Sequence, residues 1–278
     1  MTENQNPLAK HFRQPVIHFK LPSNGAFWPE GALDLPVTGE LPVYSMTTRD
    51  EVIIRTPDAL LNGSGVTSVI QSCIPEIKDA WKMPSVDVDS VLIAIRIASY
   101  SNTMDIETTC PHCKGENTYG IDLHNVLANI TVPDFNKSFT IDGLTFKFKP
   151  RQYFQMNKAN LVAFEEQKLI NTIQNTELAD SERTSLFSQH LNTIVDLSNQ
   201  MYVDSTEYIL TQDNVKVDNP VFINEFYKNS GKNVTNQVKK ILEDFAETAK
   251  IKPVKVVCSE CEKDFSVNLT FDHSHFFA

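Results

Sequence analysis

The chain has 278 residues, of which 41% are hydrophobic and 22% are charged, so it is long enough for two modest domains or one domain with an insertion. No apolar run approaches the roughly 18 residues that cross a bilayer, and residues 1–16 lack the apolar segment of a secretory signal. We therefore expect a polar N-terminal tail and no membrane partner. A net charge of −10 argues against a nucleic-acid surface, because phosphate binding needs clustered lysine and arginine.

Residues 17–103 are expected to form an N-terminal lobe of mixed structure. Proline and glycine recur between residues 15 and 44, which favours extended segments, and Phe27 and Trp28 are the expected anchors of these segments. Capping and stop signals then predict short helices, namely one opened by a capping box at Thr48–Glu51, one from Thr56-Pro57 to Asn62-Gly63, and others over 65–73 and 77–81.

A longer helix should follow from Ser85 to Tyr100. Its apolar residues lie almost all round and Arg96 is nearly its only charge, so we expect it at the centre of the N-terminal core. Asp87 and Asp89 stand near its first residues, where carboxylates favour the helix dipole. That position indicates a capping role for them, not a catalytic one.

Two stretches share an alternating pattern around a pair of cysteines. DIETTCPHCKGENTYGIDL begins at residue 105, and KVVCSECEKDFSVNLTF begins at residue 255. In each, a strand should lead into a cysteine turn and a second strand should return. The run SFTIDGLTFKFKP adds a hairpin with Asp142-Gly143 at its turn. We assign residues 104–150 and 251–278 to a split zinc ribbon with this adjoining hairpin.

Residues 151–250 have helical spacing and are expected to be an insertion between the two ribbon halves. Helices are predicted over 154–172, over 180–210, after Asn219-Pro220, and from Asn233 or Thr235 onward, the last with Val238, Ile241, Leu242 and Phe245 on its apolar face. The predicted fold class is thus α+β, with a buried helix in the N-terminal lobe.

Cys110, Cys113, Cys258 and Cys261 are the candidate metal ligands. A CxxC turn directs two thiolates toward one point, and two such turns facing each other complete a tetrahedral Cys₄ site without an open position for water. We therefore predict one structural zinc ion that clamps the C-terminal end of the chain to its middle. The free energy of zinc binding in small peptides, about 10–16 kcal/mol, exceeds the entropic cost of closing the intervening loop.

Redox chemistry is the rival interpretation of the first pair, because Cys-Pro-His-Cys also occurs in thiol oxidants of the thioredoxin superfamily. There the first cysteine begins a helix that lowers the pKa of its thiol, whereas the residues KGENTYGI that follow Cys113 are poor helix formers. His112, His273 and His275 are the other possible ligands, but four cysteines already complete the sphere. Cys73 is expected to be a small core residue.

Motifs of catalysis are missing from the sequence. It contains no phosphate-binding GxxxxGK[ST] loop, no GxGxxG after a strand, no GxSxG and no HExxH. We therefore predict that the protein is not an enzyme and works by binding other proteins.

The N-terminal part resembles a known family. The run LPSNGAFWPEGALDLPVTGELPVYSMTTRDEVIIRTPDALLNGSGVTSVIQSCIPEIKDAW, the buried helix and TTCPHCKGEN are similar to baseplate hub proteins of T-even-like, contractile-tailed bacteriophages, over roughly residues 19–123. The resemblance implies a structural or assembly component of the baseplate hub. Its partners would be other hub proteins, with self-association as a further option. Its location would be the host cytoplasm during assembly, and the virion if it is retained.

Two other functions remain open at this stage, a nucleic-acid-binding zinc ribbon and a CxxC thiol oxidoreductase. The excess of acidic residues argues against nucleic-acid binding. A thiol oxidoreductase needs only one CxxC pair, so it would leave Cys258 and Cys261 without a role. The terminal aromatic residues Phe276 and Phe277 are predicted either to contact a partner or to cover the core of the ribbon.

Overall fold

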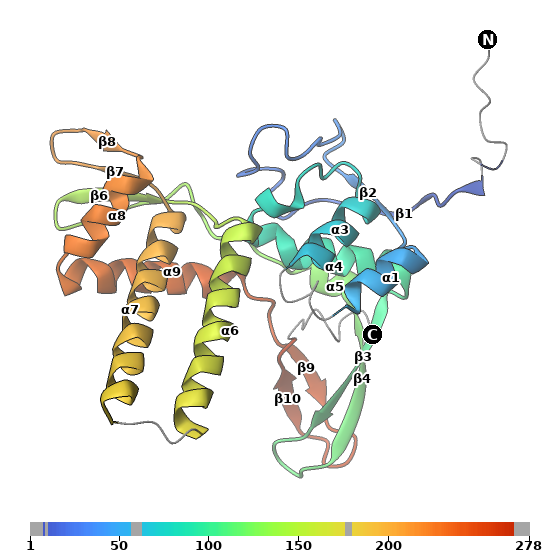
Figure 1. The fold of residues 1–278 in the computed structure, drawn as a ribbon. Helices are drawn as coiled ribbons and strands as arrows, with labels where there is room; N and C mark the ends of the chain where they lie inside the picture. Colours follow the sequence, from blue (N-terminus) through green and yellow to red (C-terminus); the bar gives the residue numbers. More distant parts are fainter. Residues whose placement is uncertain (1–7, 9–10, 57–62, 176–179, 270–278) are drawn as a thin grey trace.

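The computed structural model describes the chain except for residues 1–7, 9–10, 57–62, 176–179 and 270–278. The helix expected to start at Thr56-Pro57 and the terminal Phe276 and Phe277 fall on those residues and so lie outside the described part. The α+β class is confirmed: helices and small antiparallel sheets build an N-terminal lobe, a second lobe beside it, and two hairpins below (Figure 1).

The N-terminal lobe is packed around one helix. Strand β1 (Pro15–Phe19) pairs antiparallel with β2 (Leu41–Tyr44). Helices α1 (Thr48–Ile54) and α3 (Ser64–Cys73), the 3₁₀ turn η2 (Ala80–Lys82) and helix α4 (Ser85–Ser99) follow. The apolar run of α4 is buried on all sides, with Val91, Ile93 and Ile95 at 0% exposure. This confirms the predicted central helix.

Asp87 corrects the expectation of a capping role. The N-cap of α4 is Pro84, which provides no side-chain cap, whereas Asp87 is fully buried. Its carboxylate accepts hydrogen bonds from the Ser23 amide at 2.9 Å, the Ser23 hydroxyl, and the Trp28 indole nitrogen at 2.8 Å. Asp87 therefore fastens the extended N-terminal segment to the core helix. Of the two predicted anchors, Trp28 is the one that binds Asp87. Phe27 is 40% exposed, and its ring contacts that of Phe135.

The predicted capping box is present one residue earlier than expected. Thr47, not Thr48, is the N-cap of α1, and its reciprocal partner is Asp50. The Asp50 carboxylate accepts from the Thr47 amide at 2.8 Å, and the Thr47 hydroxyl accepts from the Asp50 amide at 3.2 Å. Asp50 also accepts a hydrogen bond from the Ser72 hydroxyl on α3 at 2.9 Å, so it joins α1 to α3.

The second lobe is a four-stranded antiparallel sheet covered by helices, with strand order β5-β6-β7-β8. The strands are β5 (Ser138–Ile141), β6 (Leu144–Phe148), β7 (Thr206–Leu210) and β8 (Lys216–Val217). The helices are α6 (Tyr153–Asn175), α7 (Asp180–Ser205), α8 (Pro220–Asn229) and α9 (Lys232–Ala249).

Two expectations are wrong in this lobe. The hairpin β5–β6 does not adjoin the ribbon, because β6 pairs with β7 and joins the sheet of the insertion. The second long helix ends at Ser205, and the segment TEYIL, expected to continue it to residue 210, forms β7. The reason is tertiary: TEYIL buries Thr206 and Ile209 against the lobe while its backbone pairs with β6.

A second apolar core lies beneath this sheet. Phe146 and Phe148 of β6 are fully buried, and Val238 of α9 is at 0% exposure among them. The predicted apolar face of α9 packs on this core, with Phe245 against the ring of Phe148. Val86, in the first turn of α4, belongs to the same core, so the central helix of one lobe reaches into the other.

The cysteine turns sit on two further hairpins. β3 (Thr103–Thr109) pairs with β4 (Glu116–Asp122), which leads into helix α5 (Leu123–Ala128). β9 (Val254–Val257) pairs with β10 (Asp264–Val267). The two hairpins are separate two-stranded sheets that lie side by side (Figure 1). Leu269, just after β10, is buried in the N-terminal core.

Among the residues described, none of the helices has both the length and the apolarity that crossing a membrane requires.

Candidate metal centre

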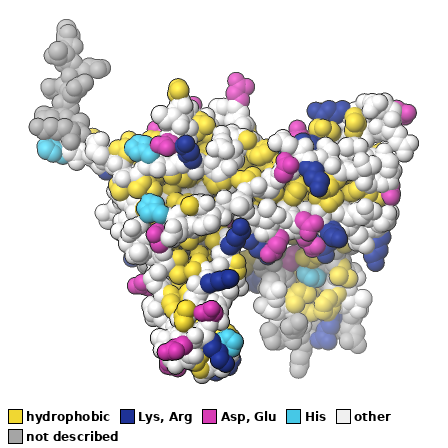
Figure 2. All heavy atoms as spheres, turned by 180° about the vertical axis from the view of Figure 1, so that it is seen from behind, with side chains coloured by type: hydrophobic (Ala, Val, Ile, Leu, Met, Phe, Trp, Pro, Cys, Tyr) yellow, Lys and Arg dark blue, Asp and Glu magenta, His cyan; other side chains and the backbone are white. Residues whose placement is uncertain are grey.

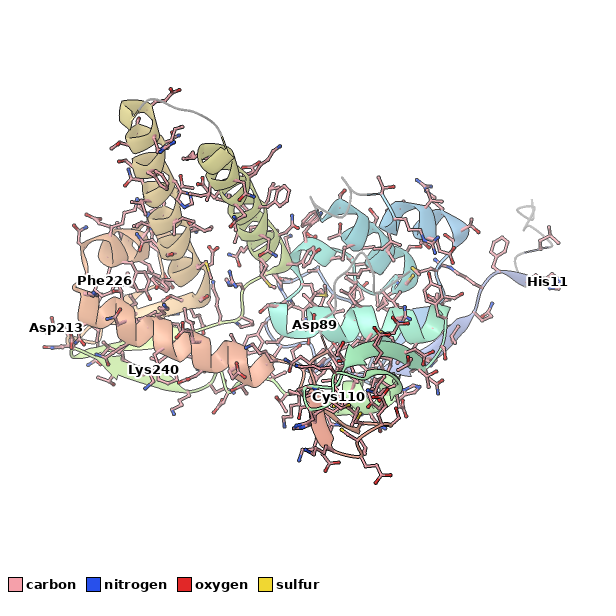
Figure 3. All side chains as sticks on the ribbon, turned by 90° about the horizontal axis from the view of Figure 1, so that it is seen from below. His11, Asp89, Cys110, Asp213, Phe226 and Lys240 are labelled. Atoms are coloured by element: carbon pink, nitrogen blue, oxygen red, sulfur yellow. The ribbon has the colours of Figure 1, made fainter. Side chains whose placement is uncertain are left out.

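The four cysteines singled out from the sequence meet at one point. Cys110 and Cys113 come from the turn between β3 and β4, and Cys258 and Cys261 from the turn between β9 and β10. Their sulfurs all lie within 4.8 Å of one another, with 3.8 Å between Cys110 and Cys261 and 3.6 Å between Cys113 and Cys258. The cluster lies where the two hairpin tips face each other, beside the Cys110 label in Figure 3.

The backbone of the first turn explains why these sulfurs converge. The Cys110 amide donates to the Gly115 carbonyl at 2.9 Å, and the Lys114 amide donates to the Cys110 carbonyl at 3.0 Å. Lys114 reverses the chain with a φ of 66°. The turn then aims two backbone amides at sulfur: that of His112 at Cys110 and that of Gly115 at Cys113, each at 3.4 Å.

The second turn repeats the main-chain pattern of the first. The Cys258 amide donates to the Lys263 carbonyl and the Glu262 amide donates to the Cys258 carbonyl, both at 3.0 Å. Glu262 has a φ of 56°. The two turns are therefore structurally equivalent, as expected of two zinc knuckles that face each other.

Contacts between the hairpins hold the two turns together, and sequence reasoning missed them. Asn117 of β4 is buried; its side-chain oxygen accepts from the Ser259 amide at 2.9 Å and from the Ser259 hydroxyl at 2.8 Å. Its amide nitrogen lies 3.6 Å from the sulfur of Cys258. Tyr119 donates to the Val257 carbonyl at 2.7 Å. The sequence did contain a signal for these contacts: side chains alternate along a strand, so Asn117 and Tyr119 lie on the same face of β4.

The arrangement of sulfurs fits a tetrahedral ion. With metal–sulfur bonds near 2.3 Å, the edge of a ZnS₄ tetrahedron is about 3.8 Å, close to the two cross-hairpin distances of 3.8 and 3.6 Å. All four ligand positions come from cysteine, which suits zinc and leaves no site for a substrate. The cluster is able to hold one metal ion.

Electrostatics support the same interpretation. Backbone amides, chiefly that of Cys261, lower the pKa of Cys258 to about 6. At Cys113 the Gly115 amide lowers the pKa, but desolvation and the neighbouring sulfurs outweigh it and raise the pKa to about 12. Four thiolates this close repel each other, so all four ionise together only when a cation neutralises them.

The other candidates lie elsewhere. His112 contributes its backbone amide to the cluster, but its ring nitrogens are not among the grouped ligand atoms. His273 and His275 lie outside the described residues. Cys73 is fully buried in the N-terminal core, and burial raises its pKa to about 12, as expected of a structural thiol. The Cys110–Cys113 turn leads into strand β4, not into a helix whose dipole would activate a thiol.

Comparison with known protein families gives a family match for the chain. A family model described as T4 bacteriophage base plate protein matches residues 32–278. This range includes all four cysteines, the whole second lobe and the N-terminal lobe from residue 32 onward. The chain belongs to this family. No curated protein matches the chain, and no solved structure matches it. As a baseplate protein it has a structural role in the phage tail and associates with other baseplate components.

Proposed function

We propose that this baseplate protein is a component of the hub or of its assembly, and that it acts through contacts with other hub proteins on a fold stabilised by zinc. The hub assignment rests on the resemblance over residues 19–123, and the family match supports the broader baseplate role. Assembly would take place in the host cytoplasm, and the protein would stay in the tail baseplate if it is retained.

The sulfur cluster carries this proposal, because it gives the fold a clamp between distant parts of the chain. Cys113 and Cys258 are 145 positions apart, and the whole second lobe lies between them. A zinc ion on the four thiolates would hold β9–β10 against β3–β4 and keep Leu269 in the N-terminal core. The ion would supply no chemistry beyond this. A rigid lobe orientation lowers the conformational cost of docking to a partner.

A nucleic-acid role is less well supported. The net charge is −10, and Figure 2 shows acidic and basic side chains interspersed over the face in view, without a broad basic patch. Phosphate backbones are bound by clustered cations. A low-salt gel shift with tight, salt-sensitive DNA binding would favour the nucleic-acid alternative instead.

The zinc proposal is tested by elemental analysis of the purified full chain, for which we expect one zinc per chain. Cys258→Ser should lose the metal and several kcal/mol of stability, since metal binding to such sites contributes directly to folding. Cys73→Ala is the matched control: it also removes a thiol but should retain zinc. If Cys258→Ser melts like the wild type and still copurifies with zinc, the ligand assignment is wrong.

The hub proposal is tested in infected cells. Mass spectrometry of proteins that copurify with the tagged chain, and of intact particles, should recover baseplate hub proteins. Recovery of outer baseplate or sheath proteins without hub proteins would contradict the hub assignment while leaving the baseplate family membership intact.

A further inference from the structure

A cavity of about 340 Å³ opens where the two lobes meet. Its walls come from three directions: Val86 at the start of α4, Phe135 ahead of the sheet, and Leu242 and Phe245 on α9, with Tyr202 of α7 closing one side. These side chains make the cavity mostly apolar. A volume of this size is within the range of pockets that bind a ligand or a large side chain.

The cavity also has a local excess of positive charge. Lys149, Arg151 and Lys239 line it, against one carboxylate, that of Glu243. Lys239 and Glu243 pair with each other at 3.6 Å, which leaves Lys149 and Arg151 as the charges available at the wall. The local excess is opposite in sign to the net charge of the chain, which is −10.

Arg151 is a partly buried charge at the cavity wall. It is only partly exposed, and its guanidinium makes no hydrogen bond or ion pair with any residue that the structure describes. Asp204 attracts both Arg151 and Lys149 without forming an ion pair with either, and the Asp204 carboxylate accepts a hydrogen bond from Gln200 at 2.8 Å. A guanidinium has five donors in a planar fork, and withdrawing them from water without acceptors costs free energy.

The ligand that satisfies both features has a carboxylate next to a large apolar group. A carboxylate accepts two parallel hydrogen bonds from an arginine fork, and this geometry is shorter and stronger than neutral hydrogen bonds. An aromatic or large aliphatic side chain fills a cavity walled by Phe and Leu. A free phosphate would satisfy the charge but not the apolar walls.

We propose that this cavity binds an acidic peptide segment of another baseplate component, with its apolar side chain between α4 and α9 and its carboxylate on Arg151 and Lys149. The inference rests on the proposed function for the origin of the partner. Charge complementarity selects the occupant, because three cationic side chains and one carboxylate line the cavity. Arginine and aromatic residues at such a site are the usual energetic centre of an interface.

The experiment uses the full zinc-loaded chain and three synthetic peptides: acetyl-Glu-Phe-Glu-amide, acetyl-Gln-Phe-Gln-amide and acetyl-Glu-Ala-Glu-amide. Binding is followed by NMR shifts of the ¹⁵N-labelled protein at low salt. The first peptide should bind saturably, with shifts around α9 and the start of α4. Loss of either its charge or its ring should weaken binding by about tenfold, which corresponds to about 1.4 kcal/mol.

Variants separate the cavity from general electrostatics. Arg151→Gln should weaken binding of acetyl-Glu-Phe-Glu-amide by about tenfold or more, and Lys149→Gln should weaken it less. Lys240→Gln is the control. It also removes one positive charge, but Lys240 lies on α9 and does not line the cavity (Figure 3). Should Arg151→Gln fail to fold, Ala246→Trp serves instead: Ala246 lines the cavity but is exposed on α9, so the ring narrows the opening without entering a core.

Several outcomes would overturn the inference. These are no saturable binding, binding that Lys240→Gln weakens as much as Arg151→Gln, and equal binding of the charged and amide peptides. Displacement of the peptide by inorganic phosphate at similar affinity would indicate an anion site instead. Zinc content and copurification of hub proteins are measured on the same wild-type preparation, so failure of the cavity and failure of the proposed function are distinguishable.

Discussion

Single polar residues inside this protein decide which distant segments meet. Asp87 collects three donors from the segment that precedes the core helix, and Asn117 joins the two hairpins through Ser259 and Cys258. Both are buried. Buried polar groups are costly unless they are fully hydrogen-bonded, so each tolerates only the arrangement that supplies its partners.

Asp87→Asn should destabilise the fold by about 1–3 kcal/mol, because the new amide group turns a donor toward the donors of Ser23 and Trp28. Chemical denaturation gives the free energy of unfolding, and Trp28 fluorescence in a Trp81→Phe background reports its release. Asp89→Asn, at an exposed position of the same helix, is the control and should change stability little. Equal effects of the two substitutions would rule out the buried network as the cause.

The residue after the second cysteine of each knuckle is a second test at this scale. Lys114 has a φ of 66°, a region that costs a β-branched residue about 1–3 kcal/mol and glycine almost nothing. Lys114→Val should therefore lower thermal stability and zinc affinity, while Lys114→Gly should leave both near the wild-type values. The same pair of changes at Glu262 should give the same order. Valine tolerated at both positions would contradict the turn geometry.

At the scale of elements, the surroundings decide what a segment becomes. TEYIL is compatible with the end of a helix, yet it forms strand β7. Its backbone pairs with β6, and its Thr206 and Ile209 side chains are buried in the lobe. Helix α9 shows the opposite case: its apolar face is strong enough to be predicted from spacing alone, and it packs where the spacing requires.

Val238→Ala should cost about 2 kcal/mol, the sum of lost apolar burial and the cavity left behind, since Val238 is at 0% exposure under the sheet. Lys240→Ala on the exposed face of the same helix should stay within about 0.5 kcal/mol of the wild type. Urea denaturation of both variants measures the difference. A small effect at Val238 would mean that α9 contributes little to the second core.

At the scale of the whole molecule, two links oppose separation of the parts. Val86 carries the central helix of the N-terminal lobe into the second core. The cysteine cluster joins the two hairpins, and the chain after β10 returns to the N-terminal core at Leu269. The first link is apolar packing, whereas the second would depend on a bound metal ion.

Under the zinc proposal, treatment with a strong chelator should therefore loosen the molecule unevenly. We expect amide hydrogen exchange to accelerate in β9, β10 and the turn ahead of β4, because two small hairpins lack a core of their own. The sheet of β5 to β8 and helix α9 should retain their protection. Readdition of zinc should restore the original exchange rates. Uniform acceleration across both lobes would show that the ion supports the entire fold and not only the clamp.

The elements that depend on nearby residues could be predicted from the sequence. The buried helix follows from an apolar run without charged interruptions, the knuckles from their CxxC turns, and the hairpin at Asp142-Gly143 from its turn residues. Three features depend on long-range packing: this hairpin joins β7, TEYIL becomes a strand, and Asp87 binds Ser23 and Trp28. The reason is distance along the chain: Asp87 and Ser23 are 64 positions apart and Asn117 and Ser259 are 142 apart, so no local periodicity encodes these pairings.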